Sequence, residues 1–581
     1  MTVLLGAYAA RSCPVKTHHA YDSTIERTSW EPDESLAELF EGGLEFETHI
    51  LDTFAASLDG TLADLRPLRE QSLAARTDAC LQAMRTGVEV ILGGWLPVDL
   101  AGQRTGSPDA LVRGIDQIDG TPRYHPVEVK WHKIIERRGL KRSQSSTPPL
   151  AYTTLASPRP LPTLVVEGYG VRVASREPDL IQLAHYHRML AAAGFATVDH
   201  AAAAIIGTDD VLRQAVLAWV DLAEPLVRTF SRSQPGGWRL RSLLERYDHE
   251  HAFRIDVAVA AQRRRAAGGG TGQADVDRPP LVRPIVTREC GRCQWWERCL
   301  PLLDPEDVSL RIDKGPLDVR EIAALRRLGV GTLTELASAD LDQLLVAYLP
   351  EVTHRSGAES RLKVACRRAR MLLRGDPFER ETSGRIEVPA AEVEIDFDIE
   401  TSAQGRVYLW GFLLHESGGS PEARYVEFSR FAELDSSAEL SLAREALTWL
   451  RGLVDSPRSI RVYHYSEYEV VAMRALAARV DDPLLSWAAD YAETEFVDLL
   501  EIVKAHFFGA SGLGLKVVAT KAAGFAWRDD DPGGLNSQSW FTEAVHGENA
   551  ELRAAARRRV LAYNEDDVIA TSRVREWLRA C

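Results

Sequence analysis

Apolar and polar residues alternate along two separate stretches of this chain, and each stretch predicts a β-hairpin. The first comprises residues 109–119 and 123–131, which lie on either side of a DGTP turn. The second comprises residues 393–414, where isoleucine and phenylalanine alternate with three acidic residues. Because successive side chains of a strand point to opposite faces, one face of the second hairpin is expected to be apolar and the other acidic.

Apolar residues at helical spacing predict helices around these hairpins. One helix is expected to begin within 42–51, and others are expected at 73–84, 182–190, 308–375, 495–507 and 559–578. A strand followed by a helix is expected at 459–476, and a flexible glycine-containing linker at 266–277. Changes in composition divide the chain into three expected domains, 1–307, 308–391 and 392–581.

The composition narrows the class of protein. Of the 581 residues, 45% are hydrophobic and 26% charged, which is typical of globular domains and excludes a disordered or fibrous chain. No apolar run approaches the roughly 18–20 residues of a membrane span. The N-terminus lacks the basic region of a signal peptide, so a cytoplasmic protein with reduced cysteines is expected. The net charge of −15 argues against simple coating of nucleic acid but allows local carboxylate metal sites.

Three residues of the first hairpin form a candidate metal site. Asp109 opens the first strand, and Glu128 and Lys130 lie two residues apart on the second strand, so both point to one face. Carboxylates on neighbouring strands can hold Mg²⁺ or Mn²⁺, which polarises a phosphodiester and activates water. The lysine can position that water or stabilise the developing charge.

The pairs Pro108-Asp109 and Glu128-Val129-Lys130 resemble the PD-(D/E)xK motif of RecB-like nucleases. The resemblance implies an α/β core of the restriction-endonuclease type within residues 1–307. Asp109 and Glu128 are then metal ligands and Lys130 is catalytic.

Three further residues fit the same resemblance. Gln182 and Tyr186 match the Q-x3-Y helix that follows the core in RecB-like nucleases, which implies catalytic roles for both. Glu47, in the helix expected to open at 42–51, is implied as a further metal ligand. It stands where many members of the family carry a histidine.

A cysteine pattern predicts a second kind of metal site. Cys290, Cys293 and Cys299 form C-x2-C-x5-C, three of the four thiolates that such a site usually needs. Cys80 lies in an amphipathic helix and is expected to be a buried apolar residue. Cys13 lies beside a proline on an irregular segment that can be steered toward a metal. The arrangement resembles the iron–sulphur branch of the RecB-like nucleases, which carry a further cysteine in a Cys-Pro segment near the start of the domain. The resemblance implies a [4Fe–4S] cluster with Cys13 as the favoured fourth ligand, and zinc is the alternative.

The acidic face of the second hairpin predicts another metal site. Asp396, Asp398 and Glu400 follow one another along one face of a strand, where like charges repel. A divalent cation explains them better than a solvated sheet edge does. Tyr563 and Asp567 lie at positions i and i+4 of the last expected helix, hence on one face.

The order of these acids resembles that of the DEDD exonucleases of the RNase H-like fold, and most closely the YprB-type subgroup. The resemblance implies that Asp398, Glu400, Glu469 and Asp567 hold two Mg²⁺ or Mn²⁺ ions. It also implies that Tyr563 orients the attacking water. Glu469 stands where proofreading-type exonucleases carry aspartate.

Together the patterns predict a multidomain α/β protein that is a metal-dependent nuclease with two nuclease sites, processing DNA ends in repair, recombination or defence. The connector at 308–391 contains an LGVGTL turn that resembles a helix-hairpin-helix element, with a plain helical connector as the alternative. The expected partners are DNA, as single strands or ends, and a separate helicase, because the chain carries no G-x4-G-K-[ST] phosphate loop. The alternatives are a nucleic-acid-binding scaffold with weak or no catalysis and an RNA-directed exonuclease.

Overall fold

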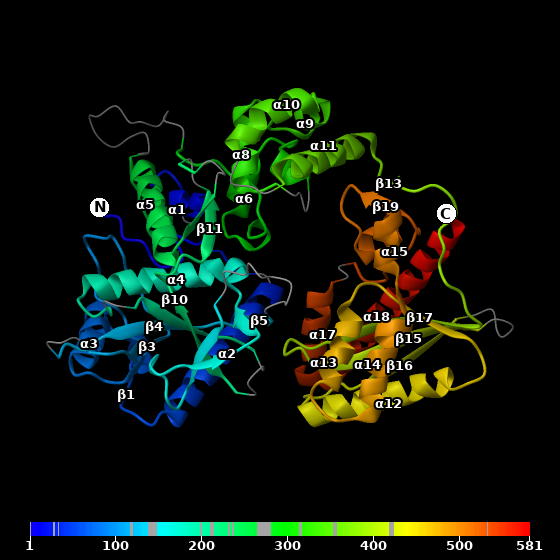
Figure 1. Cartoon of the computed structure of the whole chain (residues 1–581), viewed down its shortest axis with the longest axis horizontal. Coiled ribbons are helices and arrows are strands. Elements are labelled where there is room, and N and C mark those ends of the chain that lie inside the picture. Colours follow the sequence, from blue (N-terminus) through cyan, green and yellow to red (C-terminus); the bar gives the residue numbers. More distant parts are fainter. Residues whose placement is uncertain are drawn as a thin grey trace. The chain divides into compact units, whose positions relative to one another are not determined.

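The chain forms a mixed α/β protein of two compact units (Figure 1). The structure, a computed structural model, describes residues 2–581 apart from 27–29, 33, 117–119, 138–147, 198–199, 210–213, 231–232, 235–237, 264–279, 313–316, 353–356, 417–422 and 531–532. The expected linker at 266–277 therefore lies outside the described residues. One unit comprises Met1–Asp304 and Tyr348–Ala358, and the other comprises Pro305–Ala347 and Glu359–Cys581. Of the helices within the described ranges, none is long and apolar enough to cross a membrane.

The first unit is built on an eight-stranded sheet with the order β1-β2-β3-β4-β9-β10-β6-β7. These strands are β1 (Leu62–Asp64), β2 (Val90–Leu92), β3 (Ala110–Arg113), β4 (Tyr124–Val129), β6 (Leu150–Thr154), β7 (Leu164–Val166), β9 (Ala202–Ile206) and β10 (Val216–Asp221). Two further strand pairs join β5 (Ile135–Arg137) to β8 (Tyr169–Val171) and β11 (Val227–Phe230) to β12 (Trp238–Arg241). β3 and β4 pair antiparallel, which confirms the first predicted hairpin, although β3 ends at Arg113 and residues 117–119 are not described.

Helices cover both faces of this sheet. The helices of the unit include α2 (Glu34–Ser57), α3 (Leu73–Arg85), α4 (Val173–Ala192) and α5 (Leu243–Gln262), and α1 (Pro14–Tyr21) packs against α5. Ile205 of β9 packs in one apolar cluster with Leu180 of α4. The next residue, Ile206, packs in another with Phe54 of α2. A strand buried on both faces loses the polar alternation of a half-exposed strand, which explains why β9 is apolar throughout.

The expected helix start at 42–51 is wrong, because these residues lie in the middle of α2, which begins at Glu34. Glycines at 42 and 43 suggested a helix boundary. In the fold, Gly42 instead allows Trp131 to approach the helix: a Cβ at this position would lie 2.6 Å from Trp131 Cη2. Glycine inside a helix costs about 1 kcal/mol relative to alanine, and the close packing of an indole offsets that cost.

The segment after Pro305 is helical, as the sequence predicts. Its helices are α7 (Val308–Arg311), α8 (Val319–Arg327), α9 (Leu333–Ser338), α10 (Leu341–Tyr348) and α11 (Ala358–Arg374). Gly329, with a φ of 79°, forms the turn between α8 and α9. The fully buried Glu321 of α8 pairs with Arg361 of α11 at 2.6 Å, which joins these two helices.

The second unit also contains a five-stranded sheet with the order β16-β15-β14-β17-β18. Its strands are β14 (Val393–Thr401), β15 (Val407–Glu416), β16 (Arg424–Ser429), β17 (Ile460–His464) and β18 (Phe496–Asp498). β14, β15 and β16 pair antiparallel, whereas β14–β17 and β17–β18 are parallel. This confirms the second predicted hairpin, and it makes β14 a central strand instead of an edge. A separate pair joins β13 (Phe378–Arg380) to β19 (Phe507–Gly509).

The apolar face of β14 packs against helices, and its acidic face lies toward the last helix of the chain. Ile395, Phe397 and Ile399 are buried in a cluster with residues of α12 and α14. The helices are α12 (Ser436–Val454), α13 (Tyr468–Ala477), α14 (Pro483–Glu495), α15 (Leu499–His506), α16 (Leu515–Lys521), α17 (Gly534–His546) and α18 (Ala550–Ala580). α18 packs on β14 and β15 and confirms the helix predicted at 559–578 (Figure 1).

The single helix expected at 495–507 is wrong. Residues 496–498 form the edge strand β18, and α15 begins only at Leu499. Asp498 caps this helix: its Oδ1 accepts the N–H of Leu500 at 2.8 Å and that of Ser466 at 3.0 Å. A strand of three residues is too short to show an alternating pattern, and the helical spacing of the residues that follow it predicted one continuous helix.

Candidate active sites

The first candidate site lies where β3 begins and β4 ends. Glu128 of β4 is 1% exposed, and Lys130 Nζ donates a hydrogen bond to its Oε2. Asp109 directly precedes β3, and its Oδ2 accepts the N–H of Val129 at 2.7 Å. The structure thus brings together the three residues that the hairpin pattern singled out.

Burial has the largest effect on the pKa values of the charged groups in this site. It raises the pKa of Glu128 to about 8, with the charge of Asp109 adding to the effect and Lys130 opposing it. It also raises the pKa of Asp109 to about 6. Burial lowers the pKa of Lys130, but the two carboxylates outweigh it and the pKa is raised above its ordinary value. The site therefore carries its own cation among its acids.

Gln182 on α4 connects Glu128 to its surroundings. Its Nε2 donates to Glu128 Oε2 at 2.9 Å and to the Tyr186 hydroxyl at 3.3 Å. Its Oε1 accepts a hydrogen bond from Arg11 Nη1. Arg11 also pairs with the buried Asp179 at 3.3 Å. The sequence pattern missed Arg11 because the segment around it has no period, and only the fold brings it to α4.

Glu47 lies on α2 and belongs to the same electrostatic environment. Burial and the charge of Glu128 raise the pKa of Glu47, and Lys130 lowers it. Within the described ranges, no three acidic groups of this site bring their oxygens within 4.8 Å of one another.

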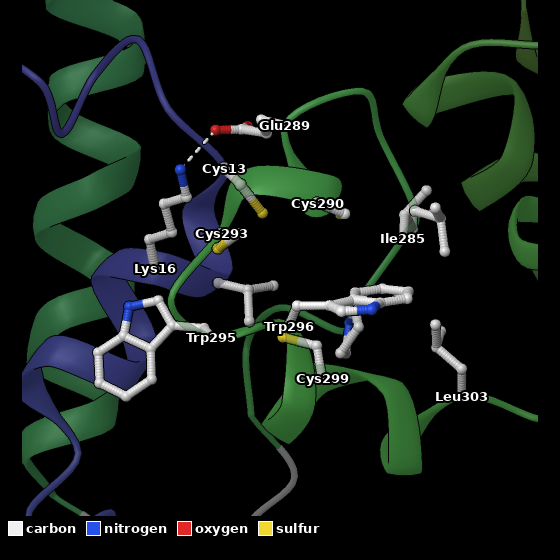
Figure 2. Close-up of a pocket in the computed structure, with 13 residues that line it drawn as sticks. Cys13, Lys16, Ile285, Glu289, Cys290, Cys293, Trp295, Trp296, Cys299 and Leu303 are labelled. Atoms are coloured by element: carbon white, nitrogen blue, oxygen red, sulfur yellow. Dashed lines mark hydrogen bonds and ion pairs between the residues drawn. The ribbon is translucent and has the colours of Figure 1, made fainter. Parts of the chain in front are cut away.

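The four predicted cysteine ligands line one pocket of the first unit. Figure 2 shows the N-terminal segment bringing Cys13 beside the segment that carries Cys290, Cys293 and Cys299. The pKa of Cys299 is raised to about 12 by burial and by the charges of the three other thiols. Thiols are the donors of zinc and iron–sulphur sites, although among the described residues no three thiols of this pocket come within 4.8 Å of one another. Cys80, by contrast, is fully buried on α3 in an apolar cluster.

Polar groups surround this pocket. Lys16 Nζ pairs with Glu289 at 2.7 Å beside Cys13 and Cys290 (Figure 2). The N–H of Thr287 donates to Cys290 Sγ at 3.3 Å. Such contacts orient a sulphur and tune a metal bound to it.

The second unit contains a tighter acidic group. Asp398 and Glu400 of β14 and Asp567 of α18 place one carboxylate oxygen each within 4.8 Å of the others. Burial raises the pKa of Glu400 to about 8 and that of Asp567 to about 6. The pKa of Asp398 is raised well above its ordinary value by burial and then by Glu400 and Asp567. Buried acids that repel one another in this way fit a divalent cation.

Each carboxylate of this triad accepts a hydrogen bond from a neutral side chain. The donors are Asn564 to Asp398, Ser537 to Glu400 and Trp527 to Asp567, each at 2.7 Å. The sequence pattern missed all three donors, because α17, α18 and the loop before them meet only in the fold. Only Asn564 had a nearby signal, since it follows Tyr563 directly.

Gly411 makes room for one of these donors. It lies directly opposite Asp398 on β15, and a Cβ there would lie 1.7 Å from Asn564 Oδ1. The missing side chain lets the Asn564 amide reach Asp398 while its oxygen accepts from Tyr425 at 2.8 Å.

The third acid of the predicted row has a different partner. Asp396 is fully buried and pairs with Arg575 Nη2 of α18 at 2.8 Å. Part of the expected repulsion along β14 is therefore relieved by an arginine, so a divalent metal is not needed to explain Asp396.

Glu469 lies near the start of α13 and close to the triad, but it is not among the three residues whose oxygens lie within 4.8 Å of one another. It raises the pKa of Asp398, and its Oε2 lies 3.4 Å from His464 Nδ1. Ser466, in the turn between β17 and α13, has a φ of 101°, a conformation that non-glycine residues rarely adopt. Strained turns of this kind cluster at functional sites.

Sequence comparison identifies this region. Residues 395–579 match the family model of the RNase H superfamily. The match covers the sheet from β14 onward together with α18, and hence the whole triad. Comparisons with curated proteins and with solved structures returned no match.

Domains of the RNase H-like type use divalent metals, and the triad of this RNase H-like domain can bind one. A bound ion would supply Lewis acidity for phosphodiester hydrolysis. Tyr563 lies on the same helix face as Asp567, and burial with the nearby acids raises its pKa, so its hydroxyl remains a hydrogen-bond donor at neutral pH. Lys516 Nζ lies 5.1 Å from the centre of the Tyr563 ring and lowers the pKa of Glu400 and Asp567. Lys516 thus places a positive charge where a phosphate would be attracted.

Proposed function

We propose that this protein is a metal-dependent nuclease that hydrolyses phosphodiester bonds in DNA. One observation carries the proposal: two buried carboxylates and one half-buried carboxylate converge within 4.8 Å in a domain that matches the RNase H superfamily. Asp398, Glu400 and Asp567 are the proposed ligands of Mg²⁺ or Mn²⁺, with Glu469 as a fourth. Tyr563 orients the attacking water in a 3′–5′ exonuclease of the DEDD type.

We propose that the first unit holds a second nuclease site, of the RecB-like type. Asp109, Glu128 and Glu47 are the proposed metal ligands, and Lys130 is the catalytic cation. The buried position of Glu128 and its hydrogen bond from Gln182 support this role, because a carboxylate held on two sides keeps its orientation. The weaker convergence of these acids makes this the less supported of the two sites.

The cysteine pocket is proposed to hold a [4Fe–4S] cluster through Cys13, Cys290, Cys293 and Cys299, with zinc as the other fit. Its supporting observation is that four cysteines from segments more than 270 residues apart line one pocket. Metal binding there would contribute directly to folding of the unit. The proposed setting is the processing of DNA ends in repair, recombination or defence, with a separate helicase to supply single strands.

The test is cleavage by anaerobically purified full-length protein with Mn²⁺ and end-labelled single-stranded DNA or RNA. Lys130→Ala, Asp398→Ala and the double variant are compared with wild type. If each single change removes a distinct set of DNA products and the double variant is inactive, both sites are working nucleases. Lys363→Ala and Asp490→Ala, at exposed positions on α11 and α14, which contribute no residue to either proposed site, are the matched controls.

Other outcomes would replace the proposal. DNA binding without cleavage would support the scaffold function. Cleavage of RNA with intact DNA would support an RNA-directed exonuclease. Loss of all products in Asp398→Ala alone would leave the RNase H-like domain as the single nuclease.

A further inference from the structure

A short chain segment of the first unit touches both the cysteine pocket and the Glu128 site. Cys13 lines the pocket, and Arg11, only two residues earlier, donates to Gln182 Oε1. Gln182 in turn donates to Glu128 Oε2 at 2.9 Å. A continuous path of contacts therefore joins a proposed cluster ligand to the proposed catalytic carboxylate.

Contacts with other elements hold the segment from Arg11 to Cys13 in place. The carbonyl oxygen of Ser12 accepts a hydrogen bond from Arg254 Nη2 at 2.8 Å, and Arg254 is 5% exposed. Arg11 Nη2 lies 3.3 Å from Asp179, which also accepts a hydrogen bond from His132 at 3.0 Å. A short chain fixed at so many points cannot shift at Cys13 without disturbing the guanidinium of Arg11.

Arg11 has the chemistry that such a link requires. Its guanidinium contacts two different acceptors through two different nitrogens, the Gln182 amide and the Asp179 carboxylate. A planar fork of donors holds two acceptors in a fixed relation, which the single ammonium of lysine does not. By holding the amide oxygen of Gln182, Arg11 directs the amide nitrogen to Glu128.

We infer that Arg11 is a positioning residue that couples the two sites, so that the geometry around Glu128 depends on whether the cysteine pocket holds its metal. Emptying the pocket removes the anchor at Cys13, so that Arg254 and Asp179 alone hold the segment. Arg11 then holds Gln182 less firmly, and the orientation of Glu128 becomes less fixed. This inference rests on the proposed cysteine-bound metal and on the proposed role of Glu128. It adds that the RNase H-like domain, which contains none of these residues, does not respond.

The primary readout is hydrogen exchange, which does not require nuclease activity. Full-length wild type and Arg11→Ala are compared before and after removal of the cysteine-bound metal by a chelator. In wild type, removal is expected to raise exchange at residues 124–130 and 179–186 at least about threefold. In Arg11→Ala these segments are expected to exchange fast before the metal is removed, although the metal content stays at the wild-type level. Removal of the metal then increases exchange only a little, since two changes that act through the same contacts are not additive.

Variants and a second readout separate this idea from simple destabilisation. Arg11→Lys keeps the charge beside Asp179 but is expected to behave like Arg11→Ala. Arg76→Ala, which removes an arginine stacked on Trp95, is the control and should match wild type. Cleavage assigned to the first unit, as the part lost in Lys130→Ala, is expected to fall at least about tenfold in Arg11→Ala and in metal-stripped wild type, whereas cleavage lost in Asp398→Ala is unchanged.

Two results would overturn the coupling: unchanged exchange at 124–130 when the metal leaves wild type, or additive effects of metal removal and Arg11→Ala. A chain purified without metal in its cysteine pocket would also overturn it. If exchange is coupled as expected but Glu128→Gln leaves cleavage intact, the coupling stands and the proposed nuclease role of the first unit fails.

Discussion

The two acidic sites of this protein contain carboxylates with similarly raised pKa values, yet they balance their charge in different ways. In the first unit, Lys130 donates directly to Glu128. In the RNase H-like domain, the triad accepts hydrogen bonds from an amide, a hydroxyl and an indole, and the charge of Lys516 lowers the pKa of Glu400 and Asp567 without cancelling the effect of burial. A cation that donates directly to a buried carboxylate relieves more of the charge repulsion than neutral donors with a nearby lysine do, so more of the repulsion in the triad is left for a bound ion to relieve.

The contrast continues within strand β14. Asp396 and Asp398 lie two residues apart on one face, and both are acids in a buried sheet. Arg575 neutralises Asp396, and Asn564 only orients Asp398. The type of partner, charged or neutral, therefore separates a structural acid from a candidate ligand more sharply than burial does.

The largest effect is expected from removing one carboxylate of the triad. In a Glu128→Gln background, Asp567→Asn should weaken Mn²⁺ binding on the order of 1,000-fold, because a ligand and a charge are both lost. Titration of Mn²⁺ by electron paramagnetic resonance measures this. The matched control is Asp566→Asn, one residue away and paired with Arg528 at 2.7 Å, which should change the affinity only a few-fold. Equal losses in the two variants would contradict the assignment of the triad.

A second test concerns the structural acid of β14. Arg575→Met should lower the free energy of unfolding by about 3–5 kcal/mol, because Asp396 is left buried without its cation. Urea unfolding with excess Mn²⁺ measures the change. Arg573→Met, on the same helix but exposed and 3.4 Å from Glu576, should stay within about 0.5 kcal/mol of wild type. A similar effect of both changes would remove the distinction between the two acids.

The pH dependence of stability should reveal the uncompensated charge of the triad. Glu400 has an ordinary pKa near 4.5 and a folded pKa of about 8, so between these values the folded state holds a proton that the unfolded state has lost. Stability of the metal-free protein must then fall as pH rises through this window, by on the order of 2–4 kcal/mol. Saturating Mg²⁺ should flatten the fall, and the Asp398→Asn variant should reduce it. A metal-free stability that rises over this range would contradict the raised pKa.

The smallest effect is expected at the neutral donors. Ser537→Ala removes the hydrogen bond to Glu400, which at about 1–2 kcal/mol corresponds to a change in Mn²⁺ affinity of roughly 5–30-fold. The exposed Ser436→Ala serves as its control. Unchanged affinity in Ser537→Ala would show that the hydroxyl does not orient the carboxylate.

The sequence could predict those parts of the sites that depend on the two-residue repeat of a strand or on the i, i+4 spacing of a helix. Alternation along 393–414 predicted the central hairpin, and the spacing of Tyr563 and Asp567 predicted a shared helix face. Arg575, Ser537, Trp527 and Arg11 could not be predicted, because each reaches its acid from an element far away in the sequence. Two predictions were wrong where local sequence and tertiary packing favour different structures. A helix was expected to begin at the glycines that lie inside α2, and β18 was expected to be part of a helix.

The cysteine pocket has a consequence for how the protein is made. A ribosome releases Cys13 well before Cys299, which lies 286 residues later in the chain. The whole eight-stranded sheet, whose last strand in sequence ends at Asp221, is therefore available to fold before the pocket can close. If the pocket binds the proposed metal, insertion of that metal is a late step in the folding of the first unit, and a chain that stops before Cys299 cannot complete it.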